Sequence, residues 1–250
     1  MRRQFQPPRL LPAAAVLNRP QQPSLRWVGD RKSGAHQAEK SLTGSLGFKS
    51  ADDVTPLLRK YGYRDAFQLA FPKDSDPLTP QNYASAIEAY ERTLTTPAPF
   101  DHFLQGDERA LTDEQKRGLR QFITVGCAEC HKGKLLGGES LAKFGIAADY
   151  WTLTRSDKPD KGLFEATKDE ADLYKFRVSM LRNIEKTPPY FHDGSIKDLQ
   201  TAIQVMAEIQ LGERLSATTV AEIEAFLKSL TGEIPANYRR PPDLGKPPKE

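Results

Sequence analysis

The stretch GCAECHKGKLLGG, residues 126–138, decides how the chain is interpreted. It holds both cysteines of the 250-residue chain, Cys127 and Cys130, and His131 follows the second cysteine directly. On a helical turn, side chains at this spacing share one face. Two thiols and an imidazole placed so closely suit three kinds of site: a redox-active thiol pair, half of a zinc site, or the covalent seat of a haem.

The C-x-x-C-H spacing favours the haem, because it is a specific signal for c-type haem attachment. A structural zinc site needs two further ligands, whereas the remaining histidines, His36, His102 and His192, occur singly. A thioredoxin-like thiol pair would lie in a strand-helix-strand context, which the sequence does not show. We therefore expect one haem c bonded to both cysteines with its iron bound by His131, and an exposed redox pair is the main alternative.

The second ligand of the iron cannot be chosen from spacing alone. A haem that transfers electrons usually takes Met or His in this position, and Met raises its reduction potential. Met206 lies on an apolar helical stripe in LQTAIQVMAEIQLG, residues 199–212, where a methionine more often fills the core. His192 is either a ligand or a hydrogen-bond donor beside the site.

Hydrophobic periodicity and capping residues predict an all-α fold, a cytochrome c-like helical domain wrapped around covalent haem, with long loops. Helices are expected within residues 49–72, 78–94, 111–126 and 215–232. Their signals include Thr79 followed by Pro80, the capping box from Thr112 to Gln115, and Gly232 as the stop of the last helix. Long loops across residues 133–175 suggest that the chain wraps a large group.

Charge and hydropathy exclude several classes of protein. The net charge is +3, and residues 1–32 hold seven Lys or Arg against one acid, Asp30. A solvated basic terminus explains this best, and no nucleic-acid motif accompanies it. The sequence contains no run of eighteen apolar residues, so it predicts no membrane-spanning helix. The apolar segment LLPAAAV is too short for the hydrophobic part of an export signal, and a proline interrupts it. We therefore do not expect it to act as a signal.

Three motifs, GCAECH (126–131), FRVSMLRNIEKTPPYFHDGS (176–195) and LQTAIQVMAEIQLG (199–212), resemble in this order the C-terminal domain of bacterial di-haem cytochrome c peroxidases. The resemblance continues upstream through residues 86–107 and 25–48 and covers nearly the whole chain. It implies a partial N-terminal, peroxide-side domain in residues 1–105 and a cytochrome c domain in 106–233, and the composition adds a Pro-rich tail in 234–250.

For the haem, the resemblance implies that the high-potential iron is bound by His131 and Met206, and it leaves Met180 a packing role. His192 becomes a residue beside the haem rather than an iron ligand. Trp27 matches the tryptophan that carries electrons between the two haems of the family.

Other positions match the peroxide side and a metal site. Gln37 matches a glutamine on the peroxide side of the first haem. Thr187 and Pro189 match residues whose carbonyl groups help to hold an inter-domain calcium ion. The sequence departs from the family at Gly47, where a catalytic glutamate is expected, and near Pro12, where an asparagine would complete the calcium site.

The family also carries a first C-x-x-C-H motif upstream, and this sequence has only one such motif. Since the family is exported, a missing motif and a missing signal lead to the expectation that the chain lacks its true N-terminus. The expected location is the periplasm, and a homodimer is compatible with the resemblance.

The sequence thus predicts an electron-transferring c-type haem protein that accepts electrons from a small cytochrome c or cupredoxin for reduction of hydrogen peroxide. A mono-haem carrier without peroxidase turnover is the first alternative. The second is the maturase branch of the superfamily, whose members place Tyr at the distal position, so Met206 argues against it.

Overall fold

The structure is a computed structural model, and it describes residues 17–18, 21–156 and 158–238. By their contacts, the described residues form two compact units. The larger unit contains Arg26–Gly29 and Thr96–Glu233; the smaller unit contains residues 17–18, 21–25, Asp30–Thr95 and 234–238. The division falls between Thr95 and Thr96, whereas the sequence interpretation placed it after residue 105.

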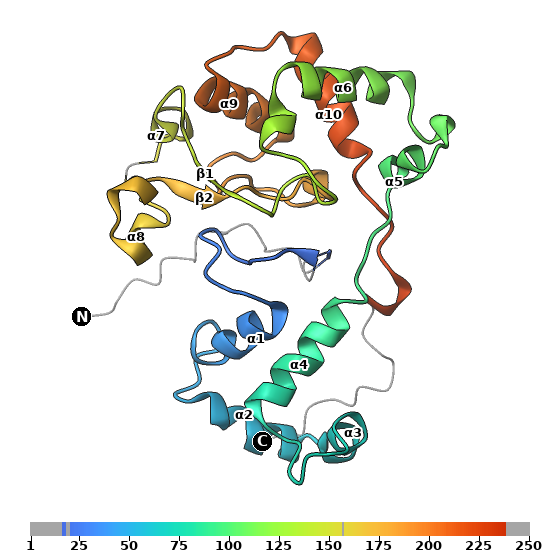
Figure 1. Ribbon diagram of the computed structural model, residues 1–250, viewed down its shortest axis with the longest axis vertical. Coiled ribbons are helices and arrows are strands. Elements are labelled where there is room, and N and C mark those ends of the chain that lie inside the picture. Colours follow the sequence, from blue (N-terminus) through green and yellow to red (C-terminus); the bar gives the residue numbers. More distant parts are fainter. Residues whose placement is uncertain (1–16, 19–20, 157, 239–250) are drawn as a thin grey trace, which may run out of the picture. The chain divides into compact units, whose positions relative to one another are not determined.

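The smaller unit is built from four helices, α1 (Gly34–Thr43), α2 (Val54–Lys60), α3 (Arg64–Ala70) and α4 (Pro80–Glu91) (Figure 1). Helix α4 begins as expected, because Thr79 caps it and Pro80 occupies its first turn. Helix α1 was not expected, and it packs along α4 with Gly34 against the side chain of Glu88. A small core fills the unit, formed by Leu42, Val54, Leu58, Phe67 and Leu78.

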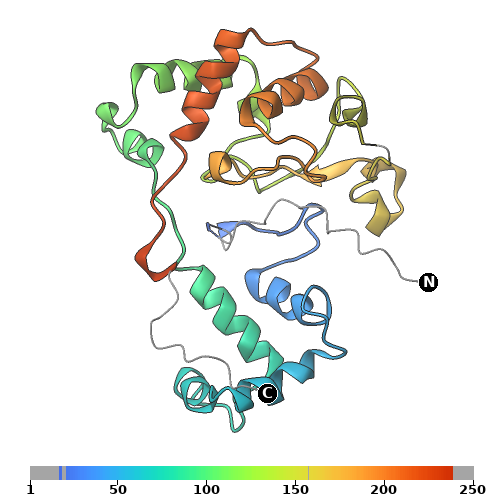
Figure 2. The same ribbon diagram turned by 180° about the vertical axis from the view of Figure 1, so that it is seen from behind.

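The larger unit contains six helices and one short sheet (Figures 1 and 2). The helices are α5 (Pro99–Leu104), α6 (Asp113–Thr124), α7 (Tyr150–Thr154), α8 (Phe164–Thr167), α9 (Leu199–Leu211) and α10 (Ala217–Lys228). Strands β1 (Leu141–Lys143) and β2 (Lys175–Arg177) pair antiparallel, with Ala142 opposite Phe176. The described residues are therefore helix-rich, and part of the segment expected as a long loop is ordered into β1, α7 and α8.

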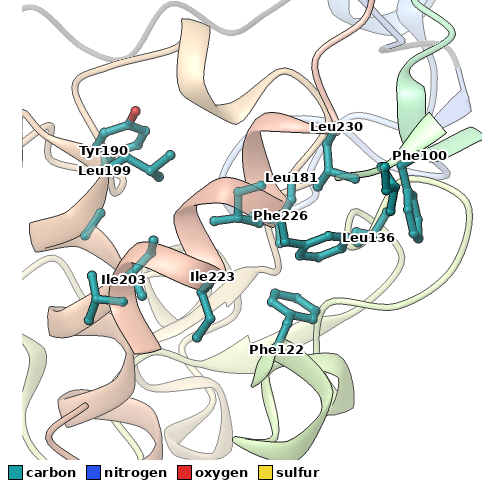
Figure 3. Close-up of a cluster of buried hydrophobic side chains, with 14 residues drawn as sticks. Phe100, Phe122, Leu136, Leu181, Tyr190, Leu199, Ile203, Ile223, Phe226 and Leu230 are labelled. Carbon is teal, nitrogen blue, oxygen red and sulfur yellow. The ribbon is translucent and has the colours of Figure 1, made fainter. Parts of the chain in front are cut away.

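Helices α6 and α10 cross at close range around Gly118. A Cβ atom added at Gly118 would lie 1.8 Å from the carbonyl oxygen of Glu222, on the backbone of α10. Arg117, beside it, donates a 2.7 Å hydrogen bond to Glu222. The rings of Phe122 and Phe226 continue the contact, with centroids 5.2 Å apart (Figure 3). Glycine at position 118 is what allows the two helices to approach this closely.

The core of the larger unit surrounds this crossing. Helix α9 contributes Leu199 and Ile203, and α10 contributes Ile223 and Phe226 (Figure 3). Ala202 of α9 and Leu227 of α10 belong to the same cluster. Cys127 and Ala128 pack against the same cluster from the turn after α6. The haem motif thus lies beside the main hydrophobic core of its unit.

Helix α10 ends earlier than expected. It stops at Lys228, and the following residues form tight turns in which Leu230 donates to the carbonyl of Leu227. The prediction that Gly232 stops the helix was wrong. Gly232 instead lies against the carbonyl groups of Thr96 and Pro97, where a Cβ atom would come within 2.4 and 2.3 Å of their oxygens.

Within the described residues, no helix combines the length and the apolar composition that crossing a membrane requires.

Candidate haem site

The motif residues lie on a tight turn that follows α6. Gly126 adopts a left-handed conformation with φ of 101°, which ends α6 and starts the short 3-10 helix Cys127–Glu129. The backbone N–H of His131 donates to the carbonyl of Cys127 at 3.0 Å. Local hydrogen bonding therefore brings Cys127, Cys130 and His131 together in one turn.

The two cysteines are free thiols, both half-buried. Burial raises the pKa of the Cys127 thiol to about 11, and the neighbouring Cys130 adds to the effect. A catalytic C-x-x-C pair needs one thiol with a lowered pKa, and Cys127 does not provide it.

His131 is held by a fixed hydrogen bond on one side of its ring. Its Nδ1 lies 3.2 Å from the carbonyl oxygen of Leu136, so Nδ1 carries the proton and Nε2 has the free lone pair. Burial lowers the pKa of His131, while the carbonyls of Leu136 and Ser179 raise it. An imidazole that donates its other N–H to a backbone carbonyl is the usual arrangement of a metal-binding histidine. The donor set therefore fits a c-type haem.

Gly137 makes this arrangement possible. Its φ is 123°, and a Cβ atom there would lie 2.2 Å from the carbonyl oxygen of Ser179 and 3.3 Å from Nδ1 of His131. Only glycine allows the loop to return so closely over the imidazole. The sequence interpretation did not single out Gly137, although the Gly137–Gly138 pair just after the motif marks a position of close backbone approach.

A buried ion pair fixes the loop behind His131. Arg182 is 5% exposed and donates two 2.7 Å hydrogen bonds to the carboxylate of Asp101 in α5. Its guanidinium also donates to the carbonyl of Lys134 at 2.9 and 3.1 Å. The planar guanidinium matches a carboxylate in two-pronged geometry, so Arg182 ties α5 to the loop that carries the haem motif.

Met206 is half-buried on α9. It follows Ala202 by four residues and Ile203 by three, so it lies on the same face of the helix as these two. Both belong to the core cluster against which Cys127 packs. This placement is compatible with the predicted role of Met206 as the second iron ligand.

His192 lies at the centre of a cluster of aromatic rings. It is 8% exposed and stacks on Phe176 with centroids 4.3 Å apart. Tyr150, Phe144 and Trp27 present their rings edge-on to it at 5.2, 5.8 and 6.3 Å. Burial lowers the pKa of His192, against the opposing effect of Asp193 and Asp160.

Trp27 is brought to this cluster by β2. The backbone N–H of Arg177 donates to the carbonyl of Trp27 at 2.6 Å, and its guanidinium donates to the carbonyl of Arg26 at 2.9 Å. Trp27 and His192 are distant in sequence and were named separately, and the structure brings them together. Spacing gave no signal of this contact.

Gln37 lies on α1, in the smaller unit. Its Nε2 donates to the hydroxyl of Ser41, which itself donates to the carbonyl of Gln37. These bonds fix the orientation of the side-chain amide. Its Oε1 is buried and has no hydrogen-bond partner among the residues that the structure describes.

Thr187 and Pro189 follow the 3-10 helix Ile184–Lys186, and both are half-buried. The hydroxyl of Thr187 donates to the carbonyl of Ile184 at 3.1 Å. Pro12, the other position named for this metal site, lies outside the described residues. Across the described ranges, no three His, Cys, Asp or Glu side chains cluster in a way that could hold a metal ion.

Comparison with known proteins identifies relatives over most of the chain. The family model described as di-haem cytochrome c peroxidase matches residues 6–109. The chain is 42% identical over 214 residues to cytochrome c551 peroxidase of Pseudomonas aeruginosa, covering 84% of this chain and 61% of that protein. It is 36% identical over 226 residues to cytochrome c551 peroxidase of Nitrosomonas europaea, covering 89% of this chain and 66% of that protein.

Among solved structures, a MauG-like protein associated with microbial copper homeostasis matches with a TM-score of 0.69 and 26% identity. The match covers 85% of this chain and 73% of that one. The chain thus spans about two thirds or less of the length of the two peroxidases, while 84% to 89% of its own length is matched.

Proposed function

This chain belongs to the di-haem cytochrome c peroxidase family, and from that premise we propose that it is a c-type haem protein that transfers electrons for the reduction of hydrogen peroxide. The single observation that carries the proposal is the pairing of the C-x-x-C-H turn with the hydrogen bond from His131 to Leu136. The alternative is a mono-haem electron carrier without peroxidase turnover.

Cys127 and Cys130 would hold the haem covalently, and His131 and Met206 would bind its iron. When bound, the haem supplies one-electron redox chemistry. The chain itself contributes the fixed orientation of His131, set by Leu136 and Gly137, and a hydrophobic wall formed by the core beside Cys127. Sulfur ligation by Met206 would raise the reduction potential and so suit the site for accepting electrons.

Trp27 would serve as the path along which electrons leave this unit, and His192 would pack between it and the haem surroundings. The aromatic contacts of His192 support both roles, because they leave its ring little freedom to turn. Gln37 would orient peroxide, which its buried and unpartnered Oε1 supports, since that oxygen could accept a hydrogen bond from a small donor.

An electron donor and a location follow from the family alone. The donor would be a small cytochrome c or a cupredoxin, the protein would work in the periplasm, and it could assemble as a homodimer.

A calcium ion held partly by the carbonyl groups of Thr187 and Pro189 is a further part of the proposal. Carbonyl oxygens suit calcium by ligand type, but they carry no charge, and calcium affinity rises with the number of charged ligands. We therefore expect weak binding by this chain, with a dissociation constant on the order of 10⁻⁴ to 10⁻³ M. Isothermal titration of the chelator-treated holoprotein with calcium measures it, and nanomolar binding would show that other residues complete the site.

The experiment that tests the haem assignment is an intact-mass measurement. After expression with a cytochrome c maturation system, the protein should exceed its apoprotein mass by one haem, and the haem should survive denaturation because it is held by thioether bonds. A variant with both Cys127→Ala and Cys130→Ala is the matched control and should carry no covalent haem. An unmodified mass for the parent chain under these conditions would contradict the proposal and favour a free thiol pair.

A further inference from the structure

Beyond the haem motif, the larger unit contains a chain of oxidisable aromatic rings that meets Trp27. Tyr150, the first residue of α7, is fully buried and lies 5.2 Å from His192. Trp151 lies edge-on to Tyr150 at 5.2 Å, and Tyr174 tilts against Trp151 at 4.8 Å. Trp151 and Tyr174 are both half-buried, so this end of the chain of rings reaches the surface.

Packing alone does not require tyrosine and tryptophan at these positions. Leucine or phenylalanine would fill a hydrophobic core without a polar atom, whereas a buried tyrosine must find partners for its hydroxyl group. Tyr150 meets this need by donating to the carbonyl of Asp160 at 3.0 Å and accepting from the N–H of Asp160 at 2.7 Å. The phenol is therefore kept in place, with a fixed acceptor for its proton.

We propose that Trp151, Tyr174 and Tyr150 form an electron relay that joins the surface of the larger unit to Trp27 through the imidazole of His192. Electron tunnelling falls steeply with distance, so rings in contact permit short steps. The relay would let an oxidised Trp27 recover an electron from a one-electron reductant that meets Trp151 or Tyr174 at the surface. The inference rests on the proposed role of Trp27 in electron transfer.

When a one-electron oxidant acts at the surface, one electron passes from Trp27 through the relay to the oxidant, and each proton that is released is accounted for. The oxidant takes one electron from Trp151, whose indole proton passes to water. Trp151 recovers an electron from Tyr150 and a proton from water, while the phenolic proton of Tyr150 passes to solvent beside the exposed Asp160. Tyr150 then takes an electron from Trp27 and regains its proton. The net change is one electron lost by Trp27 to the oxidant, with its indole proton released to solvent.

A tethered photo-oxidant tests the relay in the full-length holoprotein. Thr152 is exposed and next to Trp151, so Thr152→Cys labelled with a ruthenium polypyridyl maleimide places the oxidant at the entrance. In the holoprotein the thiols of Cys127 and Cys130 are occupied, which leaves the new cysteine as the single label site. After flash illumination with a soluble electron acceptor, peptide mass spectrometry measures oxidation products at Trp27.

The relay predicts oxidation at Trp27 in the labelled parent and its loss to the level of an unilluminated sample when Tyr150→Phe or Trp151→Phe is added. Phenylalanine keeps an aromatic ring at each position but is not oxidised by this reagent. Tyr190→Phe, a change at a buried tyrosine outside the relay, should leave the yield at Trp27 unchanged. Circular dichroism checks that each variant is folded.

Equal oxidation of Trp27 in the parent and in Tyr150→Phe would overturn the relay, as would absence of oxidation at Trp27 in the parent. The readout is ring oxidation and not peroxide turnover. A failed relay therefore leaves the proposed function standing, while a chain that takes up no haem fails the proposed function by its mass and absorption.

Discussion

Gly118→Ala should destabilise the larger unit by about 3 kcal/mol or more, at the upper end of the effects of overpacking. The new methyl group would fall 1.8 Å from the carbonyl oxygen of Glu222 and 2.9 Å from the Cβ of Phe226. The nearest of these atoms belong to the backbone of α10, so α6 and α10 must separate, and the packing of Phe122 on Phe226 is lost with them. Higher helix propensity of alanine returns only about 1 kcal/mol.

Two controls separate the clash from a general effect of alanine. Arg120→Ala changes an exposed position on the same helix and should alter stability by no more than about 0.5 kcal/mol. Gly34→Ala meets the flexible side chains of Glu88 and Glu91 at 3.1 and 3.2 Å, so it should cost less than Gly118→Ala. Urea unfolding followed by circular dichroism measures stability, and hydrogen exchange of α6 and α10 peptides locates the effect. Unchanged exchange in Gly118→Ala would refute the predicted clash.

The contrast between these elements shows which parts of the fold the sequence could predict. Helices α4 and α6 carry their own start signals, Thr79 with Pro80 and the Thr112 to Gln115 capping box, and both were predicted correctly. Helix α1 has a start signal as well, because Ser33 caps it, but it buries only Gly34 and Leu42, so few apolar side chains mark it in the sequence. Strands β1 and β2 have three residues each, too few for an alternating pattern to show.

The candidate site also has a part that the sequence predicted and a part that only the structure shows. Cys127, Cys130 and His131 lie in one turn, so their spacing in the sequence is enough to predict the site. The carbonyl groups that orient His131 belong to Leu136 and Ser179. Every residue type has a backbone carbonyl, so the sequence does not indicate these contacts. Trp27 and His192 are far apart in sequence: the residues alone singled out His192, the resemblance added Trp27, and only the fold brings the two rings together.

Met206→Ala should lower the reduction potential of the holoprotein and abolish the weak near-infrared band that sulfur ligation of ferric haem produces. Met206 shares the face of α9 that packs in the same core as Cys127, which supports its role as the ligand. Met180→Ala is the matched control, because the same residue type is removed from a position to which we assign only packing, and it should spare the band. Loss of the band in Met180→Ala alone would show that the ligand was assigned to the wrong methionine.

The same two ligands lead to a prediction for peroxide. Reduction of hydrogen peroxide needs an open or openable position on the iron and an acid-base group beside it. His131 and Met206 would fill both positions of the one haem that two cysteines can attach, and Gly47 stands where the family's carboxylate is expected and has no side chain to transfer a proton. We therefore expect this 250-residue chain to accept electrons readily but to turn over peroxide more slowly than typical enzymes, which work at about 1 to 1,000 per second.

Steady-state oxidation of a reduced small cytochrome by the purified holoprotein, with and without peroxide, measures this directly. The Met206→Ala variant refines the result, because it opens a position on the iron without adding an acid-base group at residue 47. If proton transfer limits the reaction, Met206→Ala should bind cyanide more tightly than the parent chain and still reduce peroxide slowly. Rapid turnover by the parent chain would instead mean that Met206 leaves the iron during the reaction and that another side chain supplies the proton.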